Sequence, residues 1–135
     1  MFPILYIFSD WALLVLRIAI GAIFIAHGWP KMRNLKQTRE GFNAMGFRPG
    51  TLWAPVVAVV ELGGGIALLF GLLTQVVGGL LAAQFLVILI WKLFRKEKLV
   101  GGFELDLIIF GASLILITIG GGVFSLDKFL HLRLF

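Results

Sequence analysis

The stretch 11-WALLVLRIAIGAIFIAHGWPK-31 has the length and composition of a membrane-spanning helix, yet Arg17 interrupts its apolar run and His27 lies near its end. The hydrocarbon core of a bilayer is about 30 Å thick, and about 20 helical residues cross it. A charged side chain in that core costs at least about 2.5 kcal/mol on insertion scales. Arg17 therefore predicts a polar partner on a neighbouring helix.

The composition of the whole chain also predicts a membrane protein. Of its 135 residues, 60% are hydrophobic and 14% are charged, whereas a soluble domain carries about 25% charged residues. The mean hydropathy of +1.04 agrees with this comparison. We expect the lipid bilayer to cover most of the surface, and we expect a chain of this length to form a single domain over residues 1–135.

Four apolar stretches are long enough to span a bilayer, and they predict an all-α fold, an antiparallel bundle of four transmembrane helices. Tryptophan, which prefers the membrane–water interface, stands near an end of each of the first three stretches. In the first loop, residues 36–45 predict a short amphipathic helix with Phe42, Met45 and Phe47 toward lipid. The predicted spans are residues 11–29, 53–72, 75–91 and 105–119.

Basic residues are distributed unevenly between the two ends of the predicted bundle. Loops 30–52 and 92–103 hold nine Lys and Arg residues, and the segment after the last span holds two. Because basic loops remain on the cytoplasmic side, we expect these two loops to be cytoplasmic and both termini to be outside. The net charge of +5 then has a topological role, and we expect no nucleic-acid partner.

The residues available for redox and metal chemistry are few. The chain has no cysteine, which excludes disulfides, thiolate metal sites and iron–sulfur ligation. Its two histidines, His27 and His131, lie far apart in the sequence, which argues against an internal bis-histidine haem. We expect no metal site and no covalently bound cofactor.

Glu61, in the second predicted span, is the candidate partner of Arg17. At 1.5 Å per residue the two charges lie about 10 Å apart along the bundle axis, close enough for a direct or water-bridged contact. Each charge also shares a helical face with small residues, which let helices approach and leave room for a charged group or a ligand. The sequence therefore predicts an Arg17–Glu61 pair.

Five polar residues are candidates for one intramembrane ligand site: Arg17, His27, Lys31, Glu61 and Glu104. In the last predicted span, Glu104 and Asp106 lie on nearly opposite faces, so only one of these acids can face the bundle. A structural alternative is that Arg17 and Glu61 only fix the helix register, while Lys31 and Glu104 are charges at the membrane edge.

Five stretches recur in a characteristic order: RIAIGAIFIAHGWPK (17–31), FNAMGF (42–47), VVELGGGIALLFGLLT (59–74), GGFELD (101–106) and FSLD (124–127). Together they resemble the DoxX family of small four-helix bacterial and archaeal membrane proteins. The resemblance covers nearly the whole chain and implies a DoxX-like domain in the prokaryotic cytoplasmic membrane. It maps family positions onto Arg17, His27, Gly28, Lys31, Glu61, Glu104, Ser125, Leu126 and Asp127.

The resemblance implies a connection to quinone-linked oxidation, as in thiosulfate:quinone oxidoreductase, and hence an oxidoreductase or a subunit of one. The leading hypothesis is a site for a quinone or a similar small apolar ligand. Arg17, His27 or Lys31 would donate hydrogen bonds to its oxygens, and Glu61 or Glu104 would relay protons. Its walls are predicted to include Phe24, Trp29, Trp53 and Phe85.

Two other functions stay open at the level of sequence. The chain can be a non-catalytic accessory subunit of a membrane oxidoreductase complex, with glycine-rich faces that dock a partner redox subunit. It can also be a small-solute carrier, which at four helices per chain would need a homo-oligomer.

Overall fold

A computed structural model describes residues 3–132 of the chain. This part of the chain is helical and contains no strand, and four of its helices are long and apolar enough to cross a membrane. In chain order the helices are η1 (Pro3–Phe8), α1 (Ser9–Arg33), α2 (Leu35–Met45), α3 (Gly50–Phe70), α4 (Thr74–Phe94), η2 (Leu99–Phe103), α5 (Glu104–Ile119) and α6 (Leu126–Phe129).

The observed helices confirm the four predicted spans and the predicted helix in the first loop. The largest difference is in α1, which continues through Pro30 to Arg33 rather than ending at Trp29. The turn that follows is stabilised at Asn34, whose side chain accepts a hydrogen bond from the Gln37 amide and caps α2. The extension of α1 places Lys31 on the helix and directs its side chain toward the bundle.

The four long helices form two closely packed pairs, α1 with α3 and α4 with α5. In the first pair the backbones touch through glycines, since a Cβ atom on Gly21 would lie 2.8 Å from the carbonyl oxygen of Gly65. A Cβ atom on Gly28 would lie 2.5 Å from the backbone nitrogen of Leu62. Small residues permit such close approach in membranes, and these two contacts fix the antiparallel register of α1 against α3.

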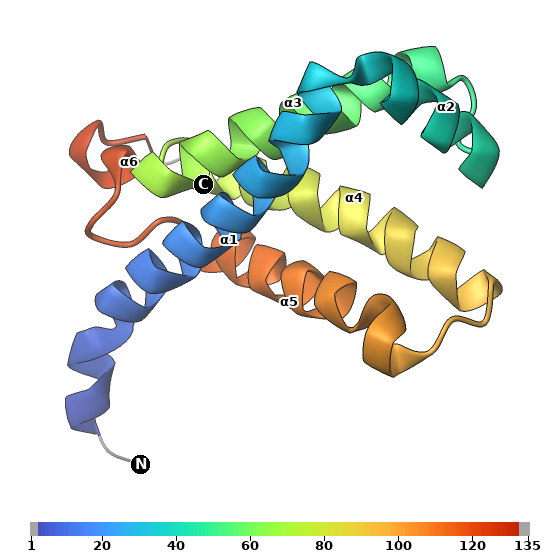
Figure 1. Cartoon of the computed structure of the whole chain (residues 1–135). Helices are drawn as coiled ribbons and strands as arrows, with labels where there is room; N and C mark the ends of the chain where they lie inside the picture. The colour runs from blue at the N-terminus through green and yellow to red at the C-terminus, as the bar shows by residue number, and fades with distance from the viewer. Residues whose placement is uncertain (1–2, 133–135) are drawn as a thin grey trace.

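A short turn connects α3 to α4, and the two helices diverge from that turn toward the opposite end of the bundle (Figure 1). Gly71, at φ +67, ends α3 in the left-handed conformation that glycine adopts without strain. Apolar side chains from all four long helices fill the core near the middle of the molecule, and they include Ile20, Phe24, Leu68, Leu81, Phe85, Ile109 and Leu116. At the diverging ends, α2 covers one side of the opening.

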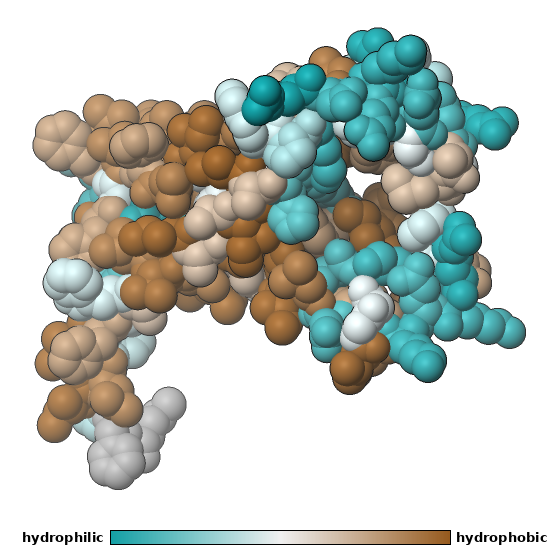
Figure 2. All heavy atoms as spheres, in the orientation of Figure 1, coloured by the Kyte–Doolittle hydropathy of each residue, from teal (hydrophilic) through white to brown (hydrophobic). Residues whose placement is uncertain are grey.

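The surface follows the pattern of a membrane protein. Figure 2 shows hydrophobic residues over the long helices, and hydrophilic residues gathered at the end that carries α2 and the α4–α5 connection. Large apolar side chains point outward from the spans, for example Val59 at 56% and Ile108 at 67% exposure. In water these positions would be costly, so the lipid bilayer is the medium that this surface fits.

Candidate functional site

A cavity of about 510 Å³ lies between α3 and α4 where they diverge, with α2 at its rim. This volume is in the range of small-ligand sites. Five polar or charged residues border the cavity: Lys31, Glu61, Gln84, Lys92 and Asp106. Its walls are apolar and aromatic: Phe42, Met45, Phe47, Trp53, Val56, Val57, Val60, Leu80, Ala83, Val87, Ile88 and Trp91.

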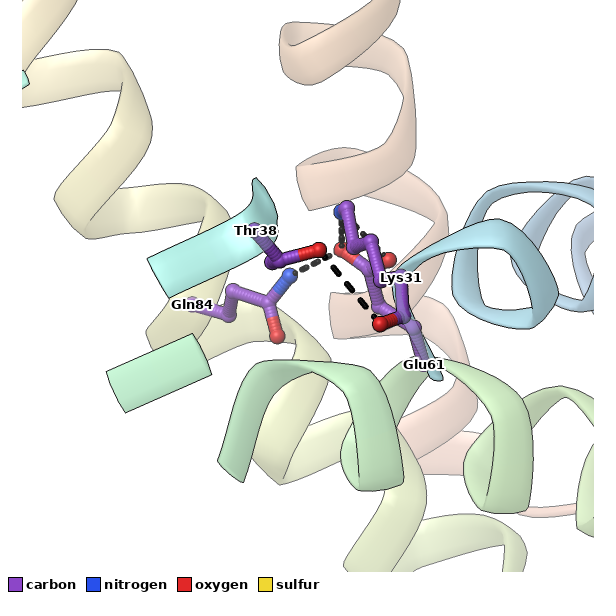
Figure 3. A network of polar contacts seen from close by, with 4 residues as sticks. All are labelled: Lys31, Thr38, Glu61 and Gln84. Carbon is purple, nitrogen blue, oxygen red and sulfur yellow. Dashed lines mark hydrogen bonds and ion pairs between the residues drawn. The ribbon is translucent and has the colours of Figure 1, made fainter. Parts of the chain in front are cut away.

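Glu61 is the centre of the polar cluster in this cavity (Figure 3). The Lys31 Nζ atom lies 2.7 Å from Glu61 Oε1 and 2.6 Å from Oε2. Gln84 on α4 donates from Nε2 to Glu61 Oε1 at 2.8 Å. The Glu61 side chain is only 4% exposed, whereas that of Lys31 is 30% exposed. The carboxylate is therefore shielded and fully engaged, and the ammonium remains accessible from the cavity.

The close contact between α1 and α3 explains why Lys31 reaches Glu61. Gly28 packs directly against the backbone at Leu62, so Lys31, one turn further along α1, arrives beside Glu61. The hydroxyl of Thr38 on α2 donates to the carbonyl oxygens of Asn34, at 2.9 Å, and of Lys31, at 3.4 Å. These bonds tie α2 to the end of α1 and hold it beside the charged pair.

A second ion pair borders the same cavity. Lys92 Nζ on α4 lies 2.6 Å from Asp106 Oδ2 on α5 and donates to the carbonyl oxygen of Gly102 at 3.0 Å. The two side chains are largely shielded, at 21% and 13% exposure. Lys92 therefore holds the end of α4 against the start of α5 and against the η2 segment (Leu99–Phe103) that precedes it.

Aromatic side chains cross the rim of the cavity beside α2. The ring of Phe47 lies between Phe42, at 6.1 Å between centroids, and Trp91 on α4, at 5.7 Å. Asn43 on α2 holds the first residue of α3, because its Oδ1 accepts a hydrogen bond from the Gly50 amide at 2.8 Å. Such an arrangement offers flat apolar faces next to charged hydrogen-bonding groups, which suits an apolar ring that carries oxygen atoms.

The comparison with known proteins agrees with this architecture. Residues 12–94, which include α2, α3, α4 and nearly all of α1, match the family model described as DoxX. The chain belongs to the DoxX family.

Two DoxX-type relatives are similar to this chain over most of their length. The chain is 36% identical over 127 residues to the Escherichia coli (strain K12) protein named "Inner membrane protein YqjF", covering 91% of this chain and 95% of the relative. It is 34% identical over 117 residues to the Bacillus subtilis (strain 168) protein named "Putative oxidoreductase CatD", covering 86% of this chain and 84% of the relative. No solved structure matches the chain.

The predicted Arg17–Glu61 pair is wrong for this DoxX protein. Arg17 is fully buried, and its Nη2 donates to the carbonyl oxygen of Phe124 at 2.6 Å, while Glu61 binds Lys31 and Gln84 instead. The glycine contacts between α1 and α3 place the two charges about 12–18 Å apart along the axis, at 1.5 Å per residue. Each charge meets a nearer partner at its own level of the bundle.

Two other predicted site residues of the DoxX pattern lie outside the cavity. His27 is exposed on the outer side of α1, and Glu104 is exposed at the start of α5, where it accepts a hydrogen bond from the Gly101 amide at 3.1 Å. On α5 it is Asp106 that faces the bundle, together with buried Ser113. Of the five candidates, the structure brings only Lys31 and Glu61 together.

The predicted walls are also revised. Trp53 borders the cavity, but Phe24 and Phe85 pack edge to face in the core, 5.5 Å apart, and Trp29 is 53% exposed. Phe42, Met45 and Phe47, which were expected to dip into lipid, instead line the rim of the cavity. The amphipathic character of residues 36–45 predicted the helix there, but an apolar face does not reveal whether lipid or protein covers it.

The opposite end of the bundle has a larger and more open hollow of about 900 Å³ between η1, α1 and α5. Its two carboxylates already hold backbone groups of the fold. Asp10 accepts from the Val123 amide at 3.0 Å, and Asp127 accepts from the Leu73 and Thr74 amides at 2.6 and 2.8 Å, which caps α4. With Arg17 bound to Phe124, these contacts fasten the C-terminal segment to the bundle, so we assign this end a structural role.

Proposed function

We propose that this DoxX protein binds a quinone or a similar small apolar ligand in the cavity between α2, α3 and α4, as a component of a redox system of the inner membrane. The observation that carries the proposal is the shielded Lys31–Glu61–Gln84 cluster at the side of an otherwise apolar, aromatic cavity. A quinone needs this combination, since its ring and tail are apolar and its carbonyl oxygens accept hydrogen bonds.

The position of the cavity suits a ligand that arrives from the bilayer. Val56 on α3 and Leu80 and Val87 on α4 border the cavity and are 43%, 50% and 52% exposed on the surface that faces lipid. An apolar ligand can therefore pass from the acyl chains into the cavity without crossing water. Figure 1 shows that α3 and α4 diverge from their shared turn, and Phe42 and Met45 of α2 line the cavity at their diverging ends.

The charged groups suit the chemistry of quinone reduction. Lys31 can donate a hydrogen bond to a carbonyl oxygen, and Glu61 can hold or release a proton beside it as the ring is reduced or oxidised. One relative is named an oxidoreductase, which supports the redox assignment. In this proposal two electrons come from a partner redox subunit or a diffusible donor. The chain contributes the binding site, and Glu61 relays the two protons from the aqueous phase one after the other.

Quinone titration in nanodiscs tests the proposal. Of the four tryptophans, Trp53 and Trp91 border the cavity while Trp11 and Trp29 do not, so a Trp11→Phe/Trp29→Phe background reports on the site through fluorescence quenching. We expect Lys31→Met to weaken quinone affinity about tenfold or more, because a charge-assisted hydrogen bond is lost. Glu104→Gln, which alters an exposed carboxylate outside the cavity, is the matched control and should leave affinity unchanged.

Replacing Lys31 alone leaves Glu61 buried beside an apolar neighbour, which can disturb the fold. The double variant Lys31→Met/Glu61→Gln removes both charges and avoids this. If the double variant is folded and binds quinone as tightly as the parent, the proposal is wrong.

One observation favours a second candidate, an accessory subunit that docks on another membrane protein. A Cβ atom added to Gly63, Gly79 or Gly111 would meet nothing within 4 Å, so these positions are open to a neighbouring helix. Affinity purification of the tagged chain from native membranes tests this role. A stoichiometric redox subunit that is lost in a Gly79→Leu variant would support it, and a chain that purifies alone in both forms would oppose it.

A further inference from the structure

The cavity contains an ion pair that the proposed function does not use. Lys92 and Asp106 border the same hollow as Lys31, Glu61 and Gln84. They come from α4 and α5, whereas Lys31 and Glu61 come from α1 and α3. The cavity is thus bordered by two separate ammonium–carboxylate pairs, and apart from Gln84 the other residues that line it are apolar or aromatic.

The spacing of the two pairs is set by α4. Gln84, which binds Glu61, and Lys92 are eight residues apart on this helix, a rise of about 12 Å. A six-membered ring with oxygens on opposite carbons, hydrogen-bonded at each end, spans about 11 Å between its two partners. The rise from Gln84 to Lys92 is close to this span, so such a ring is long enough to extend from the Glu61 end of the cavity toward the Lys92 end. A ring with oxygens on adjacent carbons presents both oxygens to the same end.

Both ammonium groups have donor capacity left for a ligand. An ammonium carries three protons. Lys92 uses two of them, on Asp106 Oδ2 and on the Gly102 carbonyl oxygen, and Lys31 directs its bonds to the two oxygens of Glu61. Each therefore keeps a proton that can bond to a ligand oxygen without breaking its ion pair. The carboxylates are shielded, at 4% and 13% exposure, and hold the lysines in place.

The geometry points to a ligand with two polar ends, an aromatic ring with oxygens at positions 1 and 4. One oxygen contacts Lys31 beside Glu61 and Gln84, the other contacts Lys92, and the ring lies near Trp91 and Phe47 at the rim. This inference rests on the proposed function and names the substrate class of the same site. It assigns Lys92 a role in ligand binding, in addition to its bonds to Asp106 and to the carbonyl oxygen of Gly102.

The test compares two ligands and two lysines. The ligands are an alkylated 1,4-benzoquinone and the matching alkylated phenol, which lacks one ring oxygen. Binding of the quinone in nanodiscs is followed by quenching of Trp53 and Trp91, and binding of the phenol by its displacement of the quinone. We expect Lys92→Met to weaken quinone affinity about tenfold and to change phenol affinity less than twofold, because the single oxygen of the phenol occupies the Lys31 end.

Lys31→Met should weaken both ligands, and Lys98→Met, at an exposed position outside the cavity, should weaken neither. If Lys92→Met weakens both ligands equally, or weakens neither, the two-ended ligand is wrong. The proposed function still stands in that case, provided that Lys31→Met weakens quinone binding. If Lys31→Met also has no effect on the quinone, the proposed function fails as well. Thermal unfolding of each variant separates loss of binding from loss of fold.

Discussion

Single charged residues determine how this bundle is closed and where it binds. Arg17 and Glu61 are both buried, yet they serve different ends of the molecule. Arg17 holds the carbonyl oxygen of Phe124, and the glycine at position 71 leaves room for its guanidinium, since a Cβ atom there would collide with Nη1. Glu61 holds Lys31 at the cavity. The attraction between two charges falls with their distance, so each charge is held by the partners within hydrogen-bonding distance, and a charge about 12–18 Å away along the axis has little influence.

Arg17→Met is expected to release the C-terminal segment from the bundle. The substitution removes the hydrogen bond that Arg17 donates to the carbonyl oxygen of Phe124, a partly buried bond to a charged group that contributes about 1.5–3 kcal/mol. Trypsin cleaves after Lys128, and cleavage needs local opening of this segment, so we expect cleavage there to become at least several-fold faster. The control is Arg33→Met, at an exposed position. Equal cleavage rates in the two variants would contradict the role assigned to Arg17.

At the scale of helices, close contact between α1 and α3 brings the site together. Gly21 and Gly28 allow the two backbones to touch, and this contact fixes which residues of α3 face which residues of α1. The register follows from backbone contact, because lipid supplies no hydrophobic driving force between apolar helices. Lys31 therefore meets Glu61 because Gly28, one helical turn away on α1, packs against the backbone of α3 at Glu61 and Leu62.

Gly28→Ala is expected to destabilise the protein and to separate Lys31 from Glu61. A methyl group at this position would meet the backbone of Leu62, which cannot move aside without shifting α3, and overpacking of this kind costs about 1–3 kcal/mol. Thermal unfolding in detergent should show a lower midpoint for Gly28→Ala. Gly63→Ala is the matched control, since its Cβ atom meets nothing within 4 Å and alanine favours helix. Comparable loss of stability in both variants would argue against the close contact.

At the scale of the whole molecule, the chain is polarised along the membrane normal. The cavity, α2 and the α4–α5 connection are at one end, and the fastened C-terminal segment is at the other (Figures 1 and 2). Nine basic residues lie in the two loops at the cavity end, against two after the last span. The positive-inside pattern therefore predicts that the cavity lies at the cytoplasmic side.

Single-cysteine labelling can check this orientation, because the chain contains no cysteine of its own. We expect a membrane-impermeant maleimide to label Lys128→Cys in intact cells, and to label Lys36→Cys only after the membrane is permeabilised. Both positions are exposed, so access to the reagent depends on the side of the membrane. The reverse labelling pattern would place the cavity at the outer side.

The extent of the domain stays a prediction. The family model matches residues 12–94, while α5 and the C-terminal segment pack against the matched part through Lys92–Asp106, Arg17–Phe124 and the Asp127 cap. These contacts are consistent with one unit over the described residues. They also explain why the terminal FSLD stretch is useful to the fold, since its Ser125 caps α6 and its Asp127 caps α4.

The sequence by itself determined the four spans, the helix in the first loop and the faces that α1 and α3 bury. These are local properties, because span length follows from bilayer thickness and burial follows from the 3.6-residue period. The small-residue faces of α1 and α3 were therefore predictable, as were Glu61 and Lys31 as polar members of the bundle.

Only the tertiary structure decided which charges meet. Helical periodicity gives the face of a residue but not its level against another helix, and that level depends on the contacts at Gly21 and Gly28. The tertiary structure also decided between Asp106 and Glu104, which lie on nearly opposite faces of α5. Asp106 faces the bundle because of how α5 is rotated against α4, and Glu104 is exposed. The position of the cavity follows from the divergence of α3 and α4, a relation between elements that no stretch of the chain encodes alone.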